Sequence, residues 1–182
     1  ALPGICIVIT PLIALMQDQV GQLNRRGIPA TAIFSGLRKR QIDILLDNCI
    51  YGNTKFLYVS PERLKTDLFI ERAKQMNISL LVIDEAHCIS QWGYDFRPPY
   101  LEIAAFRERI PTVPCIALTA SANEEVKNDI MEKLQFKQAA VFQKSFSRPN
   151  LSYSVLYEAD KEKKLAEMLQ RVPGSSIVYV RN

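Results

Sequence analysis

The feature that most constrains the fold is the apolar run at residues 80–83, which ends in the two acids Asp84 and Glu85. A continuous apolar run without alternation is typical of a strand covered on both faces of a parallel sheet. Such sheets bind ligands at the carboxyl ends of their strands, where these acids fall. Two adjacent carboxylates repel each other unless a cation lies nearby. The pattern therefore predicts a Mg²⁺ site for nucleotide phosphates, in which Asp84 holds the metal and Glu85 orients or deprotonates a water molecule.

The segment that follows the acids is rich in aromatic residues and is interrupted by Gly93 and two prolines. It contains the only tryptophan of the chain, Trp92, followed by Tyr94, Phe96 and Arg97. Aromatic rings and a guanidinium group on a loop are suited to stacking on unpaired bases. We therefore expect this loop to contact single-stranded nucleic acid.

Apolar runs and helical periodicities alternate along most of the chain. Strands are predicted at 5–9, 31–34, 55–59, 80–83 and 115–118, and helices after Thr10, from Arg38, from Ser60 to about Met76, over 101–109 and after Asn123. Thr10 and Asn123 have the side chains that favour helix N-caps. The alternation indicates an α/β fold with a parallel sheet, flanking helices and right-handed crossovers.

The pattern changes from about Lys137. Strand-like segments at 139–142, 151–156 and 177–180 accompany a charged amphipathic helix predicted over 160–171. We place a domain boundary at Arg148, so that residues 1–148 form one domain and residues 149–182 form a linker and the beginning of another. The basic residues of that helix, and the basic triplet 38–40, are expected to be solvated.

Composition sets only broad limits. The 182 residues are 48% hydrophobic and 23% charged, which suits one sizeable core and part of a second. A net charge of +4 permits a polyanionic partner without requiring one. No apolar run is long enough for a membrane helix and the start has no basic signal-peptide region, so we expect neither. The four cysteines show no CxxC spacing, so we expect buried reduced thiols and no zinc site.

The acidic box and the aromatic loop together resemble motifs of the RecQ family of DNA helicases, in superfamily 2. Residues 84–87 (DEAH) are similar to the DEAH form of the Walker B motif, and residues 86–100 to the aromatic-rich loop of that family. The loop departs from the commonest family form at Tyr94, where a histidine is usual, and at Pro99, where an acid is usual. Tyrosine can still stack, but it does not titrate near neutral pH.

The resemblance implies a role for each matching residue. Asp84, Glu85 and His87 would be catalytic, and Asp84 and Glu85 would bind ATP, with Mg²⁺ on Asp84. Nucleic-acid contacts are implied at Trp92, Phe96 and Arg97, and through motifs Ia and Ib at Thr10, Pro11, Ser60 and Arg63. The turns of these two motifs also present helix N-termini, which suit phosphates. Motif III, at 117–122, implies coupling of DNA binding to hydrolysis through Thr119 and Ser121, whose hydroxyls would contact His87, and Gln91 would share that role.

The resemblance covers essentially the whole chain and implies a RecA-like domain followed by the start of a second one. Residues 146–150 resemble the link between the two motor domains, and residues 175–182 the start of motif IV. The sequence contains no G-x-x-x-x-G-K-[ST] motif. We therefore expect a first domain that lacks the P-loop strand at its N-terminus, and an isolated chain that neither hydrolyses ATP nor unwinds DNA. The missing strand is expected to leave a hydrophobic slot in the sheet, which would lead to instability, to self-association or to occupation of the slot by other elements.

The protein implied by the resemblance is an ATP-dependent DNA helicase that moves 3′ to 5′ and acts in recombination and repair. Its partners would be single-stranded DNA and junctions of duplex with single strands, in the bacterial cytoplasm with the nucleoid or in a nucleus. One alternative is another superfamily 2 ATPase acting on RNA, which residues 91–93 and 95–97 argue against. A second is a non-hydrolysing nucleic-acid-binding module, which the missing motif supports and the intact acidic box disfavours.

Overall fold

The computed structural model describes residues 3–93, 95–144 and 148–180. It divides the chain into two compact units, Ala1–Ala140 (unit 1) and Val141–Asn182 (unit 2). The domain boundary expected at Arg148 lies C-terminal to the division between these units at Ala140 and Val141, and it remains a prediction. Tyr94 of the aromatic loop, part of the expected interdomain link and the last residues of the expected motif IV lie outside the described residues.

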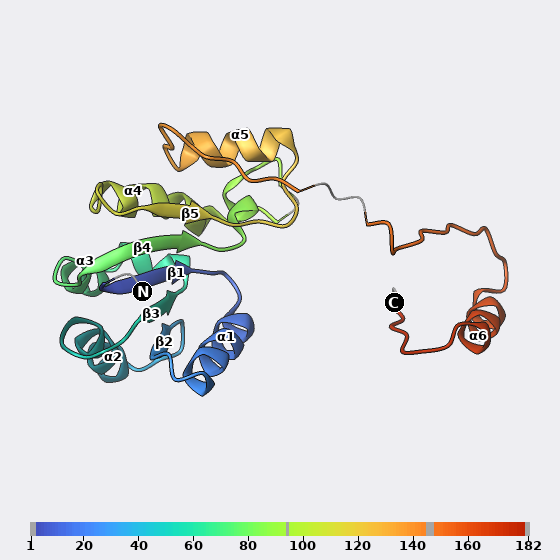
Figure 1. The fold of residues 1–182 in the computed structure, drawn as a ribbon, viewed down its shortest axis with the longest axis horizontal. Coiled ribbons are helices and arrows are strands. Elements are labelled where there is room, and N and C mark those ends of the chain that lie inside the picture. Colours follow the sequence, from blue (N-terminus) through green and yellow to red (C-terminus); the bar gives the residue numbers. More distant parts are fainter. Residues whose placement is uncertain (1–2, 94, 145–147, 181–182) are drawn as a thin grey trace. The chain divides into compact units, whose positions relative to one another are not determined.

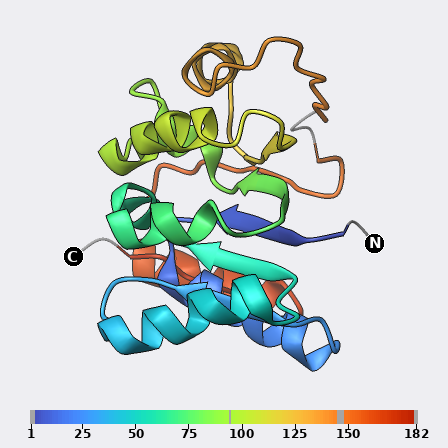
Figure 2. The same cartoon turned by 90° about the vertical axis from the view of Figure 1, so that its left-hand side faces the viewer.

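Unit 1 is built on a five-stranded parallel sheet of order β2-β3-β1-β4-β5 (Figure 1). The strands are β1 (Ile5–Ile9), β2 (Ala30–Ile33), β3 (Phe56–Val59), β4 (Ile78–Ile83) and β5 (Cys115–Ala117). Figure 2 shows the green β4, the blue β1 and the teal β3 side by side. Each of the five strands predicted between residues 5 and 118 is found within two residues of its predicted bounds, and the predicted α/β fold with a parallel sheet is confirmed.

The helices that connect the strands depart from the predictions in two places. They are α1 (Ile13–Arg25), α2 (Lys39–Tyr51), α3 (Asp67–Ala73), α4 (Glu102–Glu108) and α5 (Glu124–Lys133), with short 3₁₀ helices η1 (Pro61–Lys65), η2 (Ala86–Ile89) and η3 (Pro98–Leu101). Thr10 does not cap α1, which starts only at Ile13. The single helix predicted from Ser60 is broken at Thr66. The backbone of Thr66 is extended, and the Thr66 hydroxyl donates to Arg63 O at 2.8 Å, a local bond that competes with helix formation.

Alternate residues of each strand face opposite sides of the sheet. Ile7 and Ile9 belong to the larger apolar cluster, to which helices α2, α3, α4 and α5 contribute. Cys6 and Val8 belong to a smaller cluster with Met16 of α1. Among the described helices, α1 alone contributes to that second face. None of the described helices combines the length and the apolar character needed to cross a membrane.

The prediction of a hydrophobic slot between strands was wrong. β1 pairs directly with both β3 and β4, so the sheet is continuous through the part of the chain that the structure describes. Apolar surface is instead exposed on and next to β5, where Ile116 is 45% and Leu118 is 49% exposed. Leu80 and Val82 of β4 are only partly buried on the face that α1 covers. The uncovered apolar area therefore lies on one side of an intact sheet.

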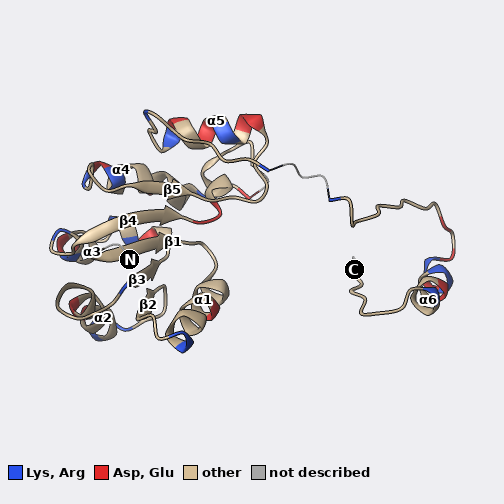
Figure 3. Cartoon of the chain, viewed as in Figure 1, with Lys and Arg blue, Asp and Glu red and all other residues tan. Residues whose placement is uncertain are grey.

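Unit 2 contains one described helix, α6 (Lys161–Arg171), which confirms the predicted amphipathic helix. Its N-cap is Asp160, whose carboxylate accepts the Lys163 N–H at 3.0 Å. Basic and acidic residues are mixed along it (Figure 3). The strands predicted at 139–142, 151–156 and 177–180 do not form. These described segments are mostly exposed and have no partner strand, and an isolated strand cannot pair its backbone groups.

A substitution at Gly4 tests how tightly the start of β1 is fixed, and the same substitution at Gly27, which follows α1, provides the comparison. Both have positive φ angles, 92° and 74°, but a Cβ at Gly4 would meet Asn77 O at 2.2 Å, whereas one at Gly27 would meet nothing within 4 Å. We expect Gly27→Ala to lower the free energy of unfolding by about 1–2 kcal/mol, the cost of the left-handed backbone alone. Gly4→Ala should lower it by roughly 2 kcal/mol more, because the backbone must also shift. Equal losses in urea denaturation would contradict the role of the Asn77 contact.

Candidate nucleotide and nucleic-acid site

The carboxyl ends of the parallel strands bring predicted site residues to one edge of the sheet. Thr10 follows β1, Ser60 follows β3, Asp84 follows β4 and Thr119 comes shortly after β5. Backbone hydrogen bonds fix these turns to one another, because Asp84 N–H donates to Ile9 O at 2.8 Å. This edge is where α/β sheets place their ligand sites.

The two acids sit in a turn that the backbone holds in an uncommon conformation. Glu85 has φ 49° and ψ 43°, the left-handed region, which directs the chain sharply into η2. Asp84 Oδ1 accepts the Glu85 N–H at 3.0 Å. No described Lys or Arg forms an ion pair with Asp84 or Glu85, although both side chains are only half-buried. This pair of carboxylates, without a cation from the described residues, fits the oxygen ligands that Mg²⁺ prefers.

His87 connects the acids to the loop that follows β5. Its ring is 5% exposed, and Nδ1 lies 3.1 Å from Thr119 Oγ1 and 3.3 Å from Glu85 Oε2. Ser121 N–H donates to the same Thr119 oxygen at 3.3 Å. The contact between His87 and Thr119 that the family resemblance implied is therefore present. The coupling role of Thr119 and Ser121 stays a prediction.

Tyr100 is a site residue that the sequence analysis missed. Its side chain is fully buried, and its hydroxyl donates to Asp84 O at 2.9 Å. Burial raises the pKa of this hydroxyl far above its ordinary value, so the group is a neutral donor. Nothing in the sequence distinguishes Tyr100 from the other aromatic residues of the segment. Only the fold shows that the end of the aromatic loop supports the acidic turn.

The tip of the aromatic loop is open, as its proposed role in stacking requires. Trp92 is 73% exposed, and Gln91 is exposed beside it. The loop passes so close to η2 that a Cβ on Gly93 would meet His87 O at 2.8 Å. Phe96 is half-buried, with Lys133 Nζ 5.9 Å from the centre of its ring. Between Gln91 and Arg97, the described residues therefore offer one largely exposed aromatic ring, Trp92, and one partly covered ring, Phe96.

Arg97 forms an ion pair with Asp95 of the same loop. Its Nε and a terminal guanidinium nitrogen donate to Asp95 Oδ2 at 3.1 and 2.9 Å. These hydrogen bonds lower the pKa of Asp95. Cys88 Sγ lies 3.9 Å from the same oxygen, and burial raises the pKa of this thiol to about 11. Arg97 N–H also donates to Cys88 O at 2.8 Å, so the loop is bound to η2 through both backbone and side chains.

The residues of the expected motifs Ia and Ib are less accessible than their predicted role suggests. Thr10 and Ser60 are 0% and 5% exposed, and Thr10 Oγ1 has no hydrogen-bond partner among the described residues. Pro11 is half-buried. Arg63 donates to Phe34 O at 3.0 Å. The burial of Thr10 and Ser60 includes their backbone, and the predicted nucleic-acid contacts of Thr10, Pro11, Ser60 and Arg63 stay predictions.

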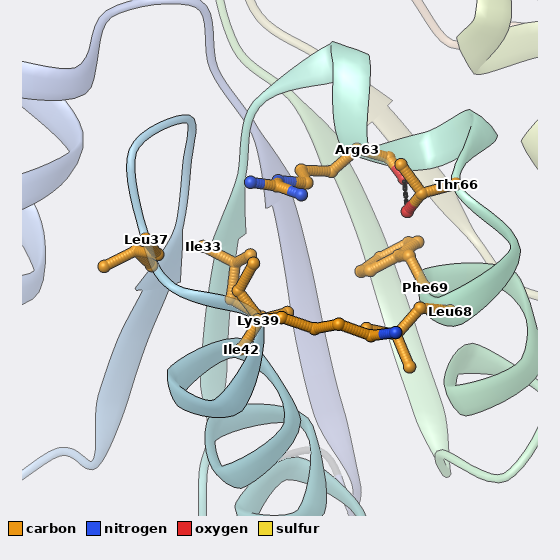
Figure 4. A pocket seen from close by; sticks show the side chains of 8 residues that line it. All are labelled: Ile33, Leu37, Lys39, Ile42, Arg63, Thr66, Leu68 and Phe69. Carbon is orange, nitrogen blue, oxygen red and sulfur yellow. Dashed lines mark hydrogen bonds between the residues drawn. The ribbon is translucent and has the colours of Figure 1, made fainter.

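A cavity of about 270 Å³ lies beside Arg63 (Figure 4). It is lined by Ile33, Leu37, Lys39, Ile42, Arg63, Thr66, Leu68 and Phe69. Figure 4 shows Lys39 and Arg63 extending along it from α2 and η1. Its wall is otherwise largely apolar, and it contains none of the acids of the DEAH box.

The parallel sheet with flanking helices, and the acidic turn at the carboxyl end of β4, define an α/β protein with a ligand-binding edge. Comparison with known proteins gives its family. Residues 2–129 match the family model described as DEAD/DEAH box helicase. The chain belongs to the DEAD/DEAH box helicase family. A solved structure with a related fold is the Hef helicase domain of Pyrococcus furiosus, with a TM-score of 0.55 at 20% identity, over 74% of this chain and 28% of that one.

The curated relatives confirm the resemblance to RecQ-family helicases. The chain is 40% identical to the probable ATP-dependent DNA helicase RecS of Bacillus subtilis, over 98% of this chain and 36% of that protein. It is 38% identical to the ATP-dependent DNA helicase RecQ of Haemophilus influenzae, over 97% and 29%. It is 40% identical to the ATP-dependent helicase SGS1 of Saccharomyces cerevisiae, over 84% and 11%. The chain thus spans little more than a third of these relatives at most.

Replacing Tyr100 tests whether its hydroxyl supports the acidic turn. Tyr100→Phe removes the donor to Asp84 O, so we expect the free energy of unfolding to fall by about 1 kcal/mol in urea denaturation followed by circular dichroism. Tyr51, which is 76% exposed on α2, provides the matched control. Tyr51→Phe should change stability by less than about 0.5 kcal/mol. Equal unfolding free energies for the two variants would contradict a stabilising Tyr100 bond.

Replacing Arg97 tests the ion pair within the loop. Arg97 lowers the pKa of Asp95, so the pair stabilises the fold above the unfolded pKa of this carboxyl and is lost as the pH falls through its lowered folded value. Arg97→Gln should therefore raise the pKa of Asp95, measured by NMR titration of its carboxyl carbon. Lys127→Gln, which breaks an ion pair with Glu124 on α5, should leave that pKa unchanged. An unaltered Asp95 pKa in Arg97→Gln would show that other groups set it.

Proposed function

We propose that this chain is part of an ATP-dependent DNA helicase motor of RecQ type, which couples single-stranded DNA binding to ATP hydrolysis. The observation that carries the proposal is the contact path from the acidic turn to the aromatic loop. Tyr100 hydrogen-bonds to Asp84 O, and Arg97 hydrogen-bonds to Cys88 O next to His87. The similarity to helicases named RecQ and RecS supports the same proposal.

The acidic turn would bind the nucleotide. Mg²⁺-bound ATP would supply the phosphoryl group to be transferred to water. Asp84 would hold the metal through its carboxylate, and Glu85 would orient the attacking water or accept its proton. His87, between Glu85 and Thr119, would report the state of this turn to the loop after β5.

The aromatic loop and the strand-end turns would bind DNA. Trp92 and Phe96 would stack on unpaired bases, an interaction worth about 1–3 kcal/mol per base. Thr10, Pro11, Ser60 and Arg63 would lie along the phosphate backbone. By family resemblance, the motor would move 3′ to 5′, act on single strands and junctions in recombination and repair, and work in a bacterial cytoplasm with the nucleoid or in a nucleus.

The isolated 182-residue chain is expected to behave differently from the protein that contains it. Its sequence has no G-x-x-x-x-G-K-[ST] motif to hold the ATP phosphates, so we expect no hydrolysis and no unwinding by this chain alone. The exposed Ile116 and Leu118 favour self-association of the isolated chain. Both expectations stay predictions.

The proposal is tested by ATP hydrolysis in the longer gene product that contains these residues, with and without single-stranded DNA or RNA. We expect DNA to stimulate turnover and Glu85→Gln to reduce it by at least about 100-fold, the scale of a lost general base. Trp92→Ala should weaken the stimulation by DNA more than the basal rate. Tyr51→Ala removes another exposed aromatic residue, away from the site, and should leave the stimulation unchanged.

Each contrary outcome points to a different function. Stimulation by RNA and not by DNA would assign the protein to another branch of superfamily 2. No hydrolysis under any condition would favour a nucleic-acid-binding module. Equal losses of stimulation in Trp92→Ala and Tyr51→Ala would remove the aromatic loop from the DNA site.

A further inference from the structure

Three potential metal ligands lie close together between η2 and the aromatic loop. Two of them are consecutive in the sequence, and the third comes from the loop. His87 and Cys88 lie on η2, and Asp95 lies on the loop. Their ligand atoms all lie within 4.8 Å of one another. Cys88 Sγ is 3.9 Å from His87 Nε2 and 3.9 Å from Asp95 Oδ2. The spacing of the cysteines predicted no zinc site, because spacing alone cannot show that the loop returns to η2.

The separations are close to those that a bound metal ion requires. Zinc bonds to sulfur at about 2.3 Å and to histidine nitrogen at about 2.0–2.1 Å in a tetrahedral arrangement, which separates the two ligand atoms by about 3.5 Å. Closing the 3.9 Å separations around an ion thus requires movements of about 0.4 Å. Side-chain rotation can supply movements of this size, and the ligand atoms of His87 and Asp95, which lie within 4.8 Å of each other, would approach in the same way.

The surroundings of His87 already orient it for this role. Its Nδ1 lies 3.1 Å from Thr119 Oγ1 and 3.3 Å from Glu85 Oε2, while Nε2 faces Cys88 Sγ. Metal-binding histidines commonly have their second nitrogen bonded to a carboxylate or another oxygen, which fixes the ring and raises its basicity. Glu85 and Thr119 supply that arrangement here.

We propose that His87, Cys88 and Asp95 form a binding site for a thiophilic divalent cation, with Zn²⁺ the physiological candidate. The Cys88 thiol would release its proton to solvent when the metal binds, and a thiolate, an imidazole and a carboxylate together favour zinc over magnesium, whose ligands are oxygens. Three protein ligands leave a fourth position for water. The ion would enter from the loop side, since the Asp95 side chain is 44% exposed while Cys88 and His87 are buried.

One neighbouring charge limits the affinity. The Arg97 guanidinium is bonded to Asp95 Oδ2, the oxygen nearest Cys88, so the ion must displace this pair or use the other oxygen. The Glu85 carboxylate on the far side of His87 offsets the cationic charge. The site therefore suits reversible binding rather than a permanent structural ion.

Such an ion would join the histidine of the DEAH box to the aromatic loop. Bound metal would hold the loop in its present place and suppress the stimulation of ATP hydrolysis by DNA. This consequence alone rests on the proposed helicase function. Metal binding by the chain itself does not depend on hydrolysis, so the two proposals can fail separately.

The test is titration of the reduced 182-residue chain with Co²⁺, which replaces Zn²⁺ and gives visible absorption and a thiolate charge-transfer band. We expect one Co²⁺ per chain with that band, displaced by Zn²⁺. Cys88→Ala should abolish the band and Asp95→Asn should weaken binding at least tenfold. Cys115→Ala, which removes a cysteine outside the cluster, should leave both unchanged.

Three results would overturn the proposal. The first is a wild-type chain without a thiolate band at millimolar Co²⁺, and the second is a band that persists in Cys88→Ala. Because Asp95 is on the exposed side of the loop, Asp95→Asn decides the question if Cys88→Ala fails to fold. Full Co²⁺ affinity in Asp95→Asn would also contradict the proposed ligand set.

Discussion

The backbone turn at Asp84 and Glu85 is held from three sides, and the arrangement of the site depends on it. Asp84 N–H donates to Ile9 O of β1, Tyr100 donates to Asp84 O, and Ala86 N–H donates to Leu118 O after β5. These bonds come from three separate parts of the chain. Left-handed backbone at a residue with a side chain costs about 1–3 kcal/mol and persists only where its surroundings impose it. The parallel pairing of β4 with β1 and β5 supplies those surroundings.

The same turn explains why the acids and the aromatic loop form one structure. The left-handed conformation of Glu85 sends the chain into η2, whose residues from Ala86 to Ile89 are all buried. Burial fixes His87 and Cys88 in place, and the chain then leaves η2 as the exposed segment that carries Trp92. The loop returns to the site at Tyr100, which is again fully buried. Its two ends are therefore anchored beside the acids, while its tip is open to solvent.

Most of the sheet could be predicted from the sequence, because buried parallel strands are continuous apolar runs such as 5–9 and 80–83. The helix after Ser60 could not, since the break at Thr66 depends on a local hydroxyl-to-backbone bond that competes with helix formation. Strands in unit 2 were predicted from β-propensity alone, and propensity cannot supply a partner strand. In the site, the acids and His87 were identified by motif, whereas Tyr100 and Asp95 required knowledge of where the loop returns. The burial of Thr10 was likewise invisible, because a strand-to-helix turn is usually near the surface.

The strengths of the loop contacts decide how the loop can move. The Asp95–Arg97 pair lies at the surface, where ion pairs contribute little because water and salt screen them. The Tyr100 hydroxyl bond is buried, and its loss would leave a carbonyl of the acidic turn without its donor, at a cost of about 1 kcal/mol or more. A ligand that competes for Arg97 therefore disrupts the surface pair before it disrupts the anchor. The segment between Ser90 and Tyr100 is thus buried at both ends, and it is joined to the acidic turn by the Tyr100 hydroxyl and to η2 by the Arg97 N–H.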